Sequence, residues 1–190
     1  MSIAYDMRSG PRWTFMAATF ACLLAISGAV VAGNTTWDRN AGWLEEQINH
    51  CASGNDEDAC RYFPARALAR LFGLAEFCSG GNCMNANEIA TKVAAGGEWS
   101  LLGPATDQKI LTRAQDMAIG GLAVIAVRVW EDMGLVAIVM PGKLFPSQTW
   151  KHEVPIATGA RIDKPSASIY GKRLNFLFAD PTKVTLYVHK

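Results

Sequence analysis

The sequence has little net charge and few histidines, and these two shortages exclude several classes of function. Its 18 basic and 17 acidic residues leave a formal charge of +1, and no basic stripe runs along the chain. A domain that binds nucleic acid normally carries such a stripe, so we expect no nucleic-acid partner. Only three histidines are present, His50, His152 and His189, which leaves few candidates for a general base.

The chain also lacks internal repeats, low-complexity tracts and the cysteine spacing of a metal or redox centre. None of its cysteines form a CxxC pair, the spacing typical of cysteine-based zinc sites. We therefore expect neither a metal nor another cofactor. With 190 residues, half of them hydrophobic, the chain is long enough for a targeting segment and one globular domain with a sizeable core.

An apolar run near the N-terminus predicts export. Residues 13–32 (WTFMAATFACLLAISGAVVA) carry no charge and follow two arginines. The small residues at the end, with Val30 at the third-last and Ala32 at the last position, fit a signal-peptide cleavage site before Gly33. The run is also long enough, at about 20 residues, to remain in a bilayer as an uncleaved anchor. We expect residues 1–32 to be a signal peptide or such an anchor, and the protein to be periplasmic or extracellular, touching the membrane only if uncleaved.

An even number of cysteines follows this segment, which in an exported protein indicates disulfides. The four are Cys51, Cys60, Cys78 and Cys83. They allow three connectivities. Because short loops close at low entropic cost, proximity along the chain favours Cys51–Cys60 and Cys78–Cys83.

The hydrophobic pattern changes from a helical to an extended period along the chain. Residues 33–44 are expected to be a linker, and 45–190 a single domain. Helices are expected at about 43–51, 60–73, 85–95 and 106–121. Strands are expected at 122–130, 134–141, 167–171, 174–179 and 183–190, with a turn at 131–134 and a loop at 99–105. Helices first and strands second predict an α+β fold, in which a helical lobe packs on a mainly antiparallel sheet.

Several motifs follow one another in an order that carries a family resemblance. Cys60 opens CRYFPARALARLFG, and residues 83–121 then hold an Asn-rich turn, a Trp and an Ala-Gln helix that ends in Gly. The strand pair LAVIAVRVWEDMGLVAIVMPG follows, and after it Trp150 with a later Val-Pro. In order and spacing this resembles the papain-like peptidoglycan hydrolases, that is the NlpC/P60, CHAP and related amidase families. The resemblance covers most of residues 45–190 and implies a papain-like fold of the NlpC/P60 type.

The resemblance also implies a site at which a cysteine thiol and an imidazole meet. A thiol at a helix N-terminus is acidified by the helix dipole, an imidazole on the adjacent strand takes its proton, and a third polar group orients the imidazole. Cys60 matches the nucleophile, but Leu135 stands where the family has its histidine, and a hydrocarbon side chain cannot move a proton. His152 is the best substitute base. Trp150 and Gln115 would contact the substrate.

These residues are compatible with two alternative functions. One is an active cysteine amidase or endopeptidase that cleaves a cell-wall peptide through Cys60, with an unusual base such as His152. The other is a non-catalytic protein of the same fold that binds peptidoglycan fragments or a protein partner. A Cys51–Cys60 bridge would remove the thiolate, and Leu135 removes the usual base. Both features favour the second function.

Overall fold

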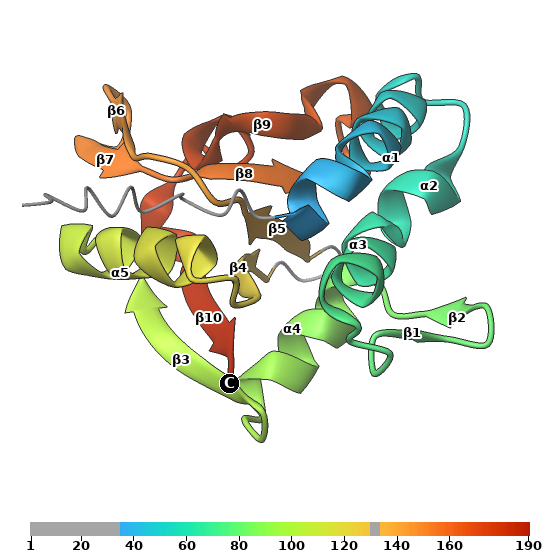
Figure 1. The fold of residues 1–190 in the computed structure, drawn as a ribbon. Helices are drawn as coiled ribbons and strands as arrows, with labels where there is room; N and C mark the ends of the chain where they lie inside the picture. Colours follow the sequence, from blue (N-terminus) through green and yellow to red (C-terminus); the bar gives the residue numbers. More distant parts are fainter. Residues whose placement is uncertain (1–34, 130–133) are drawn as a thin grey trace, which may run out of the picture. The chain divides into compact units, whose positions relative to one another are not determined.

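A computed structural model describes residues 35–129 and 134–190 (Figure 1). The signal peptide or anchor expected at residues 1–32, and most of the turn expected at 131–134, lie outside the described residues. Among the helices that the structure describes, none is both long and apolar enough to cross a bilayer. The linker expected at 33–44 is mostly wrong, because the first helix already begins at Thr35.

The described chain is a mixed α+β domain with its helices mainly first and its sheet mainly second, as the sequence predicts. The helices are α1 (Thr35–Ala52), α2 (Glu57–Arg61), α3 (Phe63–Phe72), α4 (Ala86–Ala94) and α5 (Gln108–Ile119). The strands are β1 (Cys78–Ser79), β2 (Asn82–Cys83), β3 (Trp99–Pro104), β4 (Val124–Arg128), β5 (Leu135–Val139), β6 (Phe145–Ser147), β7 (His152–Val154), β8 (Ile156–Gly159), β9 (Ile169–Arg173) and β10 (Thr185–His189). Short 3₁₀ turns span Pro165–Ala167, Leu174–Phe176 and Pro181–Lys183.

The helix expected over residues 60–73 is two helices. Asp56 caps α2 by accepting a hydrogen bond from the Ala59 amide at 3.0 Å. A continuous helix would need the residue at 64 to donate to the Cys60 carbonyl, and Pro64 has no amide hydrogen. The chain therefore restarts as α3, with Pro64 in its first turn, and α3 ends at Gly73, whose φ of 72° is left-handed.

Six strands form one antiparallel sheet in the order β3-β10-β4-β5-β8-β9. The expected loop at 99–105 is wrong, because β3 forms one edge of this sheet beside β10. Gly103 and Pro104 are typical of loops, but an edge strand tolerates proline and bulges, and the register shifts beside Leu186. The strand expected at 174–179 is also wrong: a 3₁₀ turn occupies Leu174–Phe176.

The sheet buries a separate core on each face. On one face α1, α3 and α4 pack against side chains that include Val136 and Ile138. On the other face α5 packs against side chains that include Leu135 and Ala137. Alternate residues of β5 thus belong to opposite cores, as the period of a strand requires. All five residues of β5 are buried, in agreement with its wholly apolar sequence.

Candidate functional site

Two disulfides connect all four cysteines of the described chain. Cys51 in α1 is bonded to Cys60 in α2, and Cys78 in β1 is bonded to Cys83 in β2. Both pairings are the ones that proximity along the sequence favours. No thiol remains free among the described residues, so Cys60 carries no thiolate in this state.

The Cys51–Cys60 bridge lies in the core beneath α1 and α2. The exposed fraction of Cys51 is 0% and that of Cys60 is 3%. The Ser168 hydroxyl lies 3.2 Å from the Cys51 sulfur. A bridged sulfur has no hydrogen to donate, so the hydroxyl donates to it while accepting from the Arg161 amide at 3.0 Å. The bridge is therefore shielded from solvent and held against the segment that follows β8.

Cys60 does not open a helix, contrary to the expectation from its sequence context. It is the fourth residue of the five-residue helix α2, next to the C-terminal residue Arg61. The positive end of a helix dipole acts within the first turn. The structure therefore removes the acidifying geometry that the resemblance implies for this sulfur.

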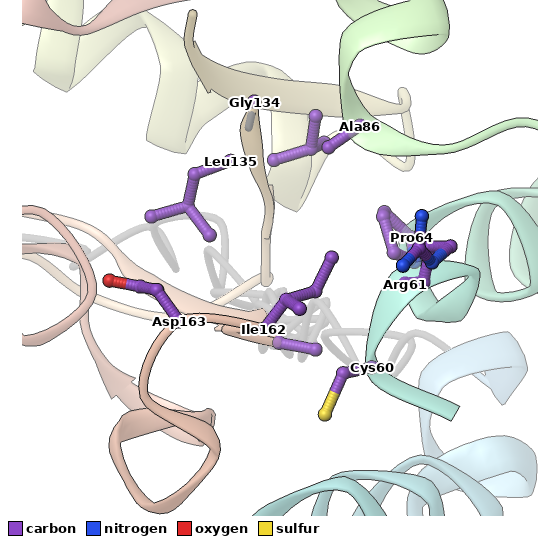
Figure 2. A pocket seen from close by; sticks show the side chains of 10 residues that line it. Cys60, Arg61, Pro64, Ala86, Gly134, Leu135, Ile162 and Asp163 are labelled. Carbon is purple, nitrogen blue, oxygen red and sulfur yellow. The ribbon is translucent and has the colours of Figure 1, made fainter. Parts of the chain in front are cut away.

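Cys60 and Leu135 nevertheless line the same small cavity (Figure 2). The lining residues are Cys60, Arg61, Pro64, Ala86, Gly134, Leu135, Val136, Ala160, Ile162 and Asp163. None of these ten is histidine. The cavity holds about 10 Å³, close to the minimum for a single water molecule.

Leu135 lines this cavity, but its side chain belongs to the core on the α5 face of the sheet. Its neighbour Val136 belongs to the opposite core, beneath α1, α3 and α4. Figure 2 shows the Cys60 sulfur directed away from Gly134 and Leu135. The two side chains that the resemblance pairs therefore border one cavity without facing each other.

Trp150 and Gln115 line neither cavity beside Cys60, and both are buried; their contact with a substrate stays a prediction. Trp150 is 3% exposed and its indole N–H donates to the Phe178 carbonyl at 3.0 Å. Gln115 is 2% exposed and its amide nitrogen donates to the Met140 carbonyl at 2.9 Å. Both side chains are buried within the domain, where large aromatic and bonded polar groups are stabilising.

His152, the substitute base expected from the sequence, opens the short strand β7 opposite Ser147. In Figure 1 the β6–β7 hairpin lies at the far side of the sheet from α2. His152 does not line the cavity beside Cys60. The structure thus does not bring the sulfur and this imidazole together.

A larger cavity beside Cys60 was not expected from the sequence. It holds about 330 Å³ and is lined by Gly54, Asp56, Glu57, Cys60, Ile162, Asp163 and Pro165. It shares three of these residues with the small cavity. The signal in the sequence is the acidic run NDED at 55–58, which supplies Asp56 and Glu57 to the cavity wall. Residues 162–165 gave no signal, because only the fold brings them to α2.

Each carboxylate of the larger cavity already has a partner. Asp163 forms an ion pair with Arg161, with a 3.0 Å bond from Nε to Oδ1, and this guanidinium holds the pKa of Asp163 below its usual value. A hydrogen bond from the Ala59 amide and, as the next largest cause, a hydrogen bond with the His50 side chain lower the pKa of Asp56. Glu57 pairs with Arg61. The lowered pKa values keep Asp56 and Asp163 ionised at neutral pH, and the guanidinium groups of Arg161 and Arg61 balance part of the negative charge of the cavity wall.

Comparison with models of protein families and with curated proteins finds no match to this chain. The family resemblance therefore rests on the motifs alone, and function has to be argued from the geometry around Cys60. Within the described residues, the side chains of the two cavities form no group of three adjacent metal ligands.

Proposed function

We propose that this chain is an exported, non-catalytic relative of the papain-like peptidoglycan hydrolases, which binds a peptide fragment of the cell wall beside Cys60. The observation that carries the proposal is the bond from the Cys60 sulfur to Cys51. A cysteine hydrolase attacks through a thiolate, and a bridged sulfur cannot form one.

The surroundings of Cys60 support the loss of catalysis independently of the bridge. A general base typically contributes about 10²–10⁴-fold to a rate, and no histidine lines the cavity that Cys60 shares with Leu135. That cavity holds about 10 Å³, whereas a scissile amide and its flanking atoms need far more space. Cys60 also borders the larger cavity, but it is only 3% exposed, and no histidine lines that cavity either.

The larger cavity supports a binding role. Its volume of about 330 Å³ lies within the range of about 300–1,000 Å³ for small-molecule sites. Ile162 and Pro165 give it apolar walls, and the carboxylates of Asp56, Glu57 and Asp163 give it acidic ones. This combination favours a short peptide that carries a free ammonium group over an anionic ligand.

Export is supported by the cysteines and by the N-terminal sequence. Disulfides persist mainly in oxidising compartments such as the periplasm or the cell exterior. Residues 13–32 have the charge-free, small-residue-ended pattern of a signal peptide. A cell-wall ligand is accessible from that side of the membrane.

The proposal is tested by offering the purified protein cell-wall peptides and measuring both cleavage and binding. We expect no release of new amino groups from peptidoglycan, and saturable binding of amine-bearing stem peptides by calorimetry. Asp163→Asn should weaken binding. Asp180→Asn should not, since Asp180 is a partly exposed carboxylate outside the cavity that accepts hydrogen bonds from Thr182.

Amine release that disappears in Cys60→Ser would contradict the proposal and restore the active-amidase alternative. If no peptide binds, and a folded protein binds the parent chain but not Asp163→Asn, the ligand is a protein partner and the proposal of a cell-wall peptide is refuted. Acetylated peptides that bind as well as free amines would refute the ammonium preference.

A further inference from the structure

Three metal-ligating side chains converge away from the Cys60 cavities, where β3 begins and β10 ends. They are Glu76, Glu98 and His189, and their ligand atoms all lie within 4.8 Å of one another. His189 Nε2 lies 3.3 Å from Glu98 Oε2. In Figure 1 the end of β10 lies well apart from α2. The geometry points to a binding site for a divalent cation of the Zn²⁺ type, formed by these three side chains.

The fold brings the three residues together through rigid neighbours. His189 is paired with Trp99 across the β10–β3 ladder, and Glu98 directly precedes Trp99. The Trp99 indole donates to Glu76 Oε1 at 3.0 Å and packs edge-on against the His189 ring, with centroids 5.2 Å apart. Trp99 is itself buried. One anchored side chain thus orients two of the three ligands, which is the role that outer-shell partners have in metal sites.

The ligand set and its spacing match Zn²⁺ better than the alkaline-earth cations. Zn²⁺ binds imidazole nitrogen and carboxylate oxygen at about 2.0–2.2 Å in a tetrahedron, which places neighbouring ligand atoms about 3.3–3.5 Å apart. The observed 3.3 Å between His189 and Glu98 is already at this spacing. Mg²⁺ and Ca²⁺ prefer six or more oxygen ligands. Three protein ligands leave a fourth position for water.

Lys92 occupies part of this site in the absence of a metal. Its ammonium nitrogen lies 3.3 Å from Glu76 Oε2, the oxygen that Trp99 does not bind. The Lys92 side chain is over a third exposed and flexible enough to turn towards solvent. A divalent cation would therefore exchange with this ammonium on Glu76. Replacing Lys92 by a neutral residue should strengthen metal binding.

The test is calorimetric titration of Zn²⁺ into untagged protein in a buffer that does not chelate metals. We expect one saturable site per chain, little response to Mg²⁺, and tighter binding by Lys92→Gln. His189→Ala and Glu98→Gln should weaken binding by about tenfold or more, since even the loss of an outer-shell partner costs about 10–100-fold. His50→Ala is the matched control, because His50 forms the other exposed histidine–carboxylate pair, with Asp56 at 3.2 Å.

Equal Zn²⁺ affinity in His189→Ala, His50→Ala and the parent protein would overturn the assignment, and so would the absence of saturable binding. Glu98→Gln keeps the test valid if His189→Ala fails to fold, because the Glu98 side chain is 76% exposed and this substitution disturbs no packing. The result is independent of the proposed peptide binding, since the two sites share no residue.

Discussion

The Cys51–Cys60 bridge should stabilise the domain more than the Cys78–Cys83 bridge does. The two bridges close loops with sequence separations of 9 and 5. Loop-closure entropy alone predicts about 2.6 and about 2.1 kcal/mol for these lengths at 25 °C, a small difference. The environments of the two bridges differ far more than their loop lengths.

Burial supplies the larger part of the expected difference. Cys51 and Cys60 belong to the core on the α1, α3 and α4 face, whereas Cys78 and Cys83 are only partly buried in a short exposed hairpin. Removing one buried heavy atom costs about 1 kcal/mol. The double variant Cys51→Ala/Cys60→Ala should therefore lose about 4.5 kcal/mol of unfolding free energy, and Cys78→Ala/Cys83→Ala about 2 kcal/mol.

Urea unfolding followed by tryptophan fluorescence measures both losses on the same scale. The gap of about 2.5 kcal/mol corresponds to about 5–10 °C in melting temperature for a domain of this size. Equal losses, or a larger loss in the hairpin variant, would refute the reasoning that the first bridge is part of the core. The control is that the two double variants have the same m value (the dependence of unfolding free energy on urea), which shows that their unfolded states are comparable.

Two further predictions concern stability. The pKa of Asp163 is held below its usual value chiefly by Arg161, so its contribution to stability is present above the unfolded carboxyl pKa of about 4 and is lost as pH falls through the lower folded value. Urea midpoints measured against pH should therefore drop less steeply in Asp163→Asn, and identical slopes would contradict this pairing. A Cβ at Gly134 would lie 2.4 Å from Asn87 Oδ1 and 2.9 Å from its backbone nitrogen, so Gly134→Ala should cost about 1–3 kcal/mol. Gly42→Ala, in α1 with open space around it, should instead stabilise by about 0.5–1 kcal/mol, and the reverse order in thermal melts would refute the close approach at Gly134.

Features set by neighbours in sequence could be predicted from the sequence. The two disulfides followed from the short separations between cysteines, and the order of helices and strands followed from the hydrophobic period. Gly73 ended its helix as expected, because a left-handed terminus is a local property. Pro64 carries the local signal for the break after α2, because its missing amide hydrogen is incompatible with a single long helix.

Features set by distant pairings could not be predicted in this way. Residues 99–104 have the composition of a loop, and they become a strand only because β10, some 80 residues later in the chain, pairs with them. Trp150 was expected at a cleft because it lies in a polar segment, but Phe178 supplies a buried partner for its indole. The larger cavity depends on Asp163 reaching α2, which no local pattern encodes.

The sequence also could not predict on which face of the sheet the side chain of residue 135 lies relative to Cys60. The motif predicts which residue begins β5, but the face on which its side chain lies depends on the register of the whole sheet. Leu135 is paired with Arg128 and packs on the α5 side. A single Leu135→His change would therefore place an imidazole in that core, not opposite the sulfur.

Peptide mapping by mass spectrometry, on unreduced protein recovered from the cells that produce it, tests the proposed loss of catalysis most directly. Free thiols are alkylated under native conditions before digestion. We predict a linked pair of peptides containing Cys51 and Cys60, and no alkylation of Cys60. An alkylated Cys60 that is not bonded to Cys51, in protein that also releases amines from peptidoglycan, would contradict the account.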